Sequence, residues 1–160
     1  MIDGERPAQN CLVCDELSGE IEIPGGVLLR DGAVVGFHAP PIKDSAVPRV
    51  YLGHLLVVSQ RHVAGLGDLK VGEAAAVGRV CARLARALRT GVGADWVYAA
   101  VVGTGVPHFH LHLVARYPDT PRTIPWHAID EWPGARRGAA PEIAAFVDEL
   151  RRSLGPSTGN

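Results

Sequence analysis

The sequence predicts an α+β domain built on an antiparallel five-stranded sheet, with one long helix and a C-terminal helix. Three observations support this fold class. Short apolar segments are separated by turn signals, one long segment has helical periodicity, and a late segment begins with a proline suited to a first helical turn. The chain has 160 residues, of which 47% are hydrophobic, and this suffices for one buried core. We therefore expect residues 1–160 to form a single domain.

The first strands are expected to flank a tight turn. Residues 27–30 and 33–37 are rich in apolar residues, and Asp31 and Gly32 between them are typical of a hairpin turn. Residues 54–58 form a third segment, which is apolar enough to be buried on both faces of a sheet. These segments predict three strands in the first part of the chain.

The long helix is expected from Val71 to about Arg89. Apolar residues recur there every three or four positions, which is the period of one helix face. These residues are Val71, Ala74, Val77, Cys81, Leu84 and Leu88. The side expected to face water carries Arg79, Arg83, Arg86 and Arg89. Gly91 and Gly93 are expected to end the helix.

The remaining elements follow this helix. Residues 96–102 predict a fourth strand, and a fifth is expected to begin at His108. The last helix is expected from about Pro141 to Leu154, since proline in a first turn lacks only an N–H that the helix does not use. Residues 117–137, rich in tryptophan and arginine, either close over a bound phosphate or pack against the sheet.

Composition excludes several classes of protein. The formal net charge is −1, and no run of like charges suggests a nucleic-acid-binding tail. No stretch of about 18 apolar residues predicts a membrane span. The three cysteines include a Cys-x-x-Cys pair, which fits a metal site in a reducing compartment better than a disulfide framework. We therefore expect a cytoplasmic protein that binds neither nucleic acid nor membrane.

The most informative segment is residues 108–112, which read His-Phe-His-Leu-His. In a strand, residues i, i+2 and i+4 share a face, so the three histidines are expected together on one face. The outer two would lie about 13 Å apart, which spans a phosphoester and its leaving group. Burying three unpaired titratable rings costs free energy, so a core strand gains nothing from them. The pattern therefore indicates chemistry.

This alternation of histidine and apolar residues resembles the motif of the histidine triad (HIT) family of nucleotide hydrolases and transferases. The similarity covers roughly Cys11 to Arg116, and residues 117–154 form an extension that we cannot match. The resemblance implies the HIT fold, usually as a homodimer, and a small-molecule nucleotide as the substrate. In the family, the middle histidine attacks the α-phosphorus of a nucleotide, and the matching residue is His110.

The resemblance also implies that His112 donates hydrogen bonds to phosphoryl oxygens and that His54 serves the leaving group as donor or acid. A third histidine favours hydrolysis, because nucleotidyltransferases of the wider superfamily carry glutamine there. We expect a nucleotide phosphohydrolase that forms a nucleotidyl-histidine intermediate, acting on nucleoside phosphoramidates or dinucleoside polyphosphates. The alternatives are a nucleotide-binding or sensor module with weak catalysis, and a specialised hydrolase of a biosynthetic phosphate intermediate.

A metal site is expected at Cys11 and Cys14. Two thiolates at this spacing form half of a tetrahedral zinc site, although such pairs also occur in redox proteins. The redox interpretation needs a long helix after the pair, and residues 18–20 argue against one. The resemblance implies that His62 and His108 complete the site, as in zinc-binding HIT members. Zinc with four protein ligands has no open position, so we expect it to be structural.

The resemblance also indicates where the substrate binds. The apolar slot for the base corresponds to Leu12, Val13, Phe37 and Leu56, and the phosphate-binding segment to Gly103, Thr104, Gly105 and Val106. Family members usually carry an acid that holds the ribose hydroxyls where this chain has Ala39. We therefore expect weaker discrimination between ribonucleotides and 2′-deoxyribonucleotides than in relatives with the acid.

Overall fold

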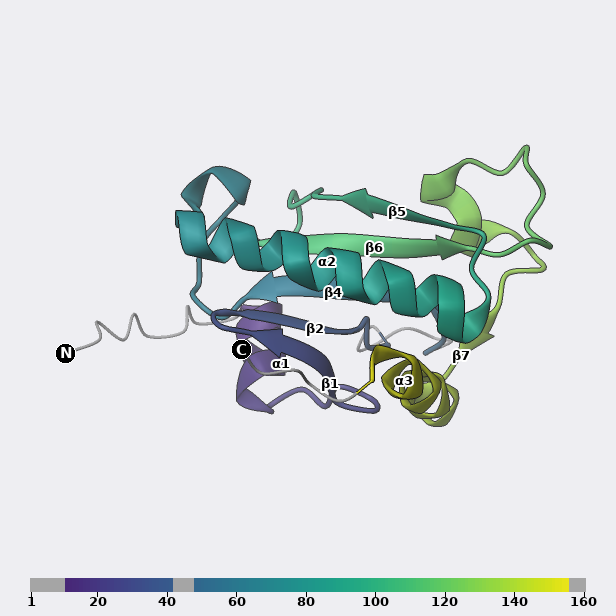
Figure 1. The fold of residues 1–160 in the computed structure, drawn as a ribbon, viewed down its shortest axis with the longest axis horizontal. Helices are drawn as coiled ribbons and strands as arrows, with labels where there is room; N and C mark the ends of the chain where they lie inside the picture. Colours follow the sequence, from purple (N-terminus) through teal and green to yellow (C-terminus); the bar gives the residue numbers. More distant parts are fainter. Residues whose placement is uncertain (1–10, 42–47, 156–160) are drawn as a thin grey trace.

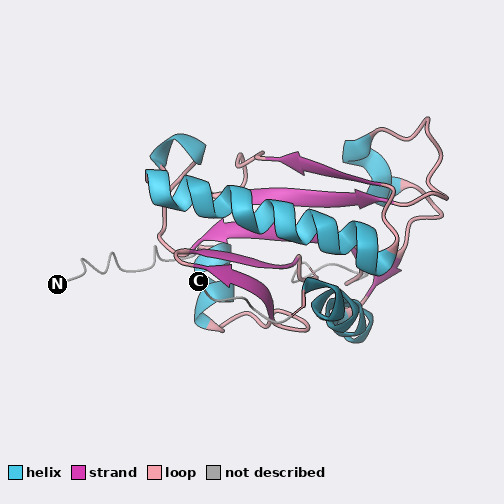
Figure 2. Cartoon of the chain, in the orientation of Figure 1, coloured by secondary structure: helices cyan, strands magenta, loops and turns pink. Residues whose placement is uncertain are grey.

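The computed structural model describes residues 11–41 and 48–155, and its centre is a five-stranded sheet in the order β1-β2-β4-β6-β5 (Figure 1). All neighbouring strands in it are antiparallel. The strands are β1 (Val27–Asp31), β2 (Val34–His38), β4 (His54–Ser59), β6 (His110–Arg116) and β5 (Trp96–Ala100). Helix α2 (Val71–Val92) covers one face, and the short helix α1 (Leu12–Ser18) packs on the other (Figure 2). The expected fold class is confirmed.

The predicted hairpin is present, and Asp31 pairs with Val34 across its turn. β4 is the central strand of the sheet, and its last five residues are buried, as its apolar sequence predicted. Leu55 and Val57 of this strand belong to the larger core on the α2 side. Leu56 and Val58 belong to a second apolar cluster on the α1 side. The sheet therefore separates two cores, and the smaller one lies under α1.

Helix α2 approaches the sheet closely at Gly36 of β2. A Cβ at this position would lie 2.6 Å from Cδ1 of Leu84 and 3.2 Å from Cγ1 of Val80, so there is no room for a side chain. Both α2 residues are fully buried. Because Gly36 has no side chain, α2 can pack this close to the sheet at this point.

The predicted buried face of α2 is partly wrong. Val71, the first residue of the helix, and Ala74 are exposed. Alanines occur on both the buried and the exposed side of this helix, so hydrophobicity alone does not show which side is buried. The buried residues are Glu73, Ala76, Val77, Val80, Leu84, Ala87 and Leu88. The helix also continues through Gly91 and ends at Gly93, whose φ of +73° is a left-handed conformation that glycine adopts readily.

The histidine strand begins at His110 rather than His108, and β5 ends at Ala100 rather than at residue 102. The late start of β6 is explained by the loop before it, where the N–H of Phe109 donates to the carbonyl of Val63 outside the sheet ladder. This turn of the chain leaves His108 beside the N-terminal segment instead of within the strand.

The last helix, α3 (Ala140–Leu154), confirms the prediction, with Pro141 in its first turn. It packs against α2, and Ile143, Val147 and Leu150 form its buried side. A two-stranded sheet of β3 (Val50–Tyr51) and β7 (Arg137–Gly138) was not predicted. Two 3₁₀ turns, η1 (Leu66–Asp68) and η2 (Trp126–Glu131), complete the described elements. Across the described ranges, no helix is long and apolar enough to cross a membrane.

Candidate active site and metal site

The four expected metal ligands lie together. The ligand atoms of Cys11, Cys14, His62 and His108 are all within 4.8 Å of one another. His108 Nδ1 lies 3.4 Å from Cys11 Sγ and 3.5 Å from Cys14 Sγ, and His62 Nδ1 lies 3.4 Å from Cys14 Sγ. Tetrahedral zinc with ordinary Zn–S and Zn–N bonds would place sulfur and nitrogen ligands about 3.5 Å apart. The donor set and its spacing therefore fit zinc.

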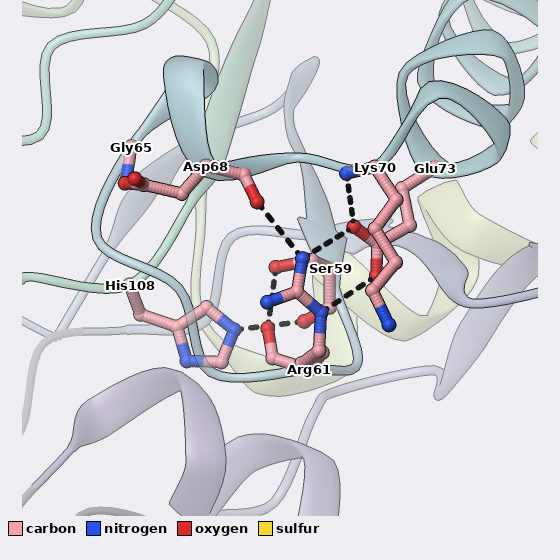
Figure 3. A network of polar contacts seen from close by, with 7 residues as sticks. All are labelled: Ser59, Arg61, Gly65, Asp68, Lys70, Glu73 and His108. Carbon is pink, nitrogen blue, oxygen red and sulfur yellow. Dashed lines mark hydrogen bonds and ion pairs between the residues drawn. The ribbon is translucent and has the colours of Figure 1, made fainter.

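A network of hydrogen bonds orients His108 (Figure 3). Its Nε2–H donates to the carbonyl of Ser59 at 2.7 Å, which leaves the Nδ1 lone pair facing the thiols. The Ser59 hydroxyl donates to the Arg61 carbonyl at 2.8 Å, and the Arg61 guanidinium forms a bidentate ion pair with Glu73 at 2.7 and 3.0 Å. Glu73 also accepts from the N–H of Lys70 at the start of α2. The cluster is thus tied to the N-terminus of α2.

The orientation of His110 is set by its neighbour in sequence. Its Nδ1 lies 2.7 Å from the carbonyl oxygen of His108. Because a carbonyl only accepts, Nδ1 carries the proton, and in the neutral ring Nε2 keeps a free lone pair. The backbone therefore selects the tautomer in which Nε2 can act as a nucleophile.

His112 is paired with His54 of the neighbouring strand. His54 Nε2 and His112 Nδ1 are 2.9 Å apart, so one ring donates and the other accepts. Burial, together with His112, His38 and His110 nearby, lowers the pKa of His54 to about 3. Burial and then His110 also lower the pKa of His112. Both rings are therefore neutral near pH 7, and a neutral ring can supply the lone pair that this hydrogen bond needs.

A cavity of about 390 Å³, here called the first cavity, lies beside these histidines. Its polar lining includes His54, His110 and His112. Its apolar lining comprises Leu12, Val13, Ile21, Ala39, Pro40, Pro41, Leu56 and Val106. Four of the expected substrate-binding residues, Leu12, Val13, Leu56 and Val106, are thus brought to one cavity. Phe37 is fully buried beneath it, and Gly103, Thr104 and Gly105 do not line it, so their role stays a prediction.

The residues of the first cavity that sequence reasoning missed include an acid, Glu16. This side chain is only 4% exposed, and its Oε2 has no hydrogen-bond partner within residues 11–41 and 48–155. Burial, and to a smaller extent Asp15, raises the pKa of Glu16 to about 7. The available signal was its position four residues after Leu12, which places both on one side of a helix once α1 is known.

A second cavity, of about 260 Å³, also borders the His54–His112 pair. These two histidines line both cavities. The second cavity is also lined by Tyr51, Trp126, His127 and Asp130. Trp126 stacks on Tyr98 with ring centroids 6.1 Å apart. The segment rich in tryptophan and arginine therefore packs partly on the sheet and partly borders this cavity.

The comparisons with known proteins show the family and the fold. The sequence profile of the HIT domain matches residues 22–119, and the chain therefore belongs to the HIT family. The comparison with curated proteins gave no significant match.

Three solved structures share the fold. The chain is similar to a zinc-bound histidine triad family protein from Mycobacterium smegmatis, with 25% identity, coverage of 91% of this chain and 93% of the other, and a TM-score of 0.65. A hypothetical histidine triad nucleotide-binding protein from Sulfolobus tokodaii has 16% identity, coverage of 90% and 91%, and a TM-score of 0.67. A Hit-like protein involved in cell-cycle regulation from Bartonella henselae has 17% identity, coverage of 92% and 99%, and a TM-score of 0.64.

Proposed function

We propose that this protein hydrolyses nucleoside phosphoramidates or dinucleoside polyphosphates through a nucleotidyl intermediate on His110. The observation that carries the proposal is the tautomer of His110, whose Nδ1–H is held by the His108 carbonyl at 2.7 Å. Its free Nε2 belongs to a side chain that lines an otherwise largely apolar cavity. This arrangement suits a neutral imidazole nucleophile and needs no metal at the reacting phosphorus.

In the proposed first step, Nε2 of His110 attacks the α-phosphorus, a P–N bond forms, and the bond to the leaving group breaks. The leaving group departs with the electron pair of the broken bond. Where the leaving group is an amine, it takes a proton from water. In the second step, water attacks phosphorus and the electron pair of the P–N bond returns to Nε2. One proton of the water goes to solvent, and a nucleoside monophosphate is released.

We assign His112 the role of donor to the phosphoryl oxygens. If His54 Nε2–H donates across the 2.9 Å contact to His112 Nδ1, the proton of His112 must lie on Nε2, where it is available to the substrate. A pKa of about 3 makes His54 a poor proton donor to a leaving group. We therefore propose that His54 mainly positions His112 and fixes its tautomer.

The two cavities suggest how a substrate is arranged. The His54–His112 pair borders both, so a substrate whose phosphorus is bound at this pair could occupy both cavities. We propose that the first cavity receives the nucleoside, because its walls are mainly apolar. The second cavity, bordered by Trp126 and His127, would then receive the leaving group.

We further propose that zinc binds Cys11, Cys14, His62 and His108. The sulfur–nitrogen distances of 3.4–3.5 Å and the zinc-bound relative from M. smegmatis support this assignment. When bound, the ion would cross-link the N-terminal segment to the loop before β6 and stabilise the fold. A homodimer in the cytoplasm, formed from single-domain chains, stays our expectation from the family resemblance and the composition.

Steady-state kinetics with adenosine and guanosine 5′-phosphoramidates test the proposal. His110→Gly should remove essentially all turnover and leave the melting temperature close to that of the native protein. Added imidazole should restore part of the activity, because it can occupy the space of the missing ring. Turnover by His110→Gly without imidazole would refute the covalent mechanism.

A second candidate is a nucleotide-binding module with weak catalysis. Ala39 favours it, because the acid that holds the ribose hydroxyls in other family members is missing and a poorly held nucleotide is turned over less efficiently. Tight binding of nucleoside monophosphates without turnover of either phosphoramidate would support that candidate instead. Turnover of a phosphate ester that contains no nucleoside, with no binding of nucleotides, would indicate a specialised hydrolase.

A further inference from the structure

The first cavity contains a carboxyl group that the mechanism does not use. Ala39 offers no acceptor to the sugar, yet Glu16 of α1 lines the same cavity. Among the described residues that line this cavity, Glu16 is the only acid. The presence of this carboxyl group in the first cavity therefore needs a physical explanation.

The environment of Glu16 does not explain a carboxyl group there. The side chain is 4% exposed, and Oε2 has no hydrogen-bond partner in the part of the chain that the structure describes. A buried carboxyl oxygen without a partner lowers stability, and an apolar residue would suit the packing of α1 better. A ligand that donates hydrogen bonds to Oε2 would satisfy it.

The path of α1 indicates which part of a ligand Glu16 would meet. The helix follows Cys11, which contacts His108 near the start of β6, and the chain then continues to β1 at the far edge of the sheet. The apolar cluster around α1 includes Phe37 of β2 and Leu56 of β4. Helix α1 therefore packs on β2 and β4, and Glu16 lines the first cavity from this helix, whereas His110 lies on β6. With phosphorus at the histidines, the nucleoside would extend toward Glu16.

We propose that Glu16 determines specificity in the first cavity by accepting hydrogen bonds from a pair of adjacent donors on the nucleoside. This inference rests on the proposed function, because it assumes that the phosphate lies at His110. Two parts of a nucleoside offer such a pair, namely N1–H with the 2-amino group of guanine, and the two ribose hydroxyls. A carboxylate accepts through both of its oxygens, so it can bind both donors of such a pair.

Calorimetric binding of GMP, IMP, AMP and 2′-deoxy-GMP tests this role. IMP lacks the 2-amino group, and 2′-deoxy-GMP lacks one ribose hydroxyl. We expect the native protein to bind GMP better than at least one of these two. Glu16→Gln should weaken GMP binding about ten- to a hundredfold and abolish that preference, because it removes one acceptor of the pair. Loss of the preference over IMP would identify the base as the source of the donors, and loss of the preference over 2′-deoxy-GMP would identify the ribose.

Glu20→Gln is the matched control, because it removes an exposed acid of the same segment that does not line the cavity. It should leave all four affinities unchanged. Glu16→Leu adds a second readout, since replacing a buried carboxyl that has an unpaired oxygen should keep or raise the melting temperature. A lower melting temperature with unchanged nucleotide preferences would show a structural role and overturn the inference.

Two further results would also overturn the role of Glu16, and only the second would overturn the proposed function as well. If the native protein binds GMP, IMP and 2′-deoxy-GMP equally, or Glu16→Gln keeps the native preference, Glu16 does not read the nucleoside, although the proposed function survives. If the native protein binds none of the four nucleotides, the proposed function fails together with the role of Glu16.

Discussion

The most quantitative prediction concerns the buried histidine His38 at the end of β2. Its side chain is fully buried, Nδ1–H donates to the carbonyl of Ala39 at 2.8 Å, and Nε2 accepts from the N–H of Gly53 at 3.2 Å. Protonation of Nε2 would remove the second hydrogen bond and bury a charge. Burial accordingly lowers the pKa of His38 from 6.5 to about 4, against the opposing effect of the bond to Ala39.

The sign of the effect on stability follows from linkage. Because the pKa is lower in the folded state, the unfolded chain binds more protons at this site below pH 6.5. The contribution is therefore complete above pH 6.5 and is lost as the pH falls through the folded pKa of about 4. A pKa that differs by one between the folded and unfolded states corresponds to about 1.4 kcal/mol, so protonation of His38 alone should remove roughly 3 kcal/mol of folding free energy across this window.

Urea denaturation of the native protein and His38→Gln at pH 7.5, 6.5, 5.5 and 4.5 measures this effect. Glutamine does not titrate, and the other groups titrate in both proteins, so the difference between the two free energies isolates His38. His38→Gln should be less stable at pH 7.5, and the difference should shrink by about 2.5 kcal/mol by pH 4.5. A difference that stays constant over this range would refute the assignment of a neutral, hydrogen-bonded His38.

Three other predictions address the fold, the metal site and the sugar. Gly36→Ala would place a Cβ 2.6 Å from Cδ1 of Leu84, so it should lower the free energy of unfolding by about 1–3 kcal/mol, measured in urea. Cys11→Ser should reduce the zinc content from about one ion per chain to none and lower the melting temperature; metal analysis showing equal zinc in both proteins would contradict this. Ala39→Asp should raise the preference for ribonucleotides over 2′-deoxyribonucleotides up to about tenfold in calorimetric binding, if the new carboxylate reaches the ribose.

Elements with a strong local pattern could be predicted from the sequence. The hairpin was recognisable from the turn at Asp31 and Gly32, and β4 from its continuous apolar sequence. The paired strands β3 and β7 could not be predicted, because each has two residues and they pair across most of the length of the chain. The seven residues of α1 are likewise too few to show a helical period.

The candidate site divides in the same way. His110 and His112 are visible because their alternation has no other simple explanation, and the Cys-x-x-Cys spacing is equally conspicuous. Glu16 is not visible, since in the sequence it is one acid among neighbours such as Asp15 and Glu20. Only the fold shows that it is buried in the first cavity. The hydrogen bond between His54 and His112 is not visible in the sequence either, because it joins two strands that are far apart along the chain.

The central claim is that His110 forms a covalent bond to the nucleotide, and rapid-quench mass spectrometry tests it most directly. The native protein is mixed with excess adenosine 5′-phosphoramidate, quenched within the first turnover under conditions that preserve N-phosphoryl bonds, and digested. The mechanism predicts an adenylyl group on the peptide that contains residues 108–112, with fragmentation placing it on His110. Turnover with no labelled peptide, or with the label on another residue, would contradict the claim.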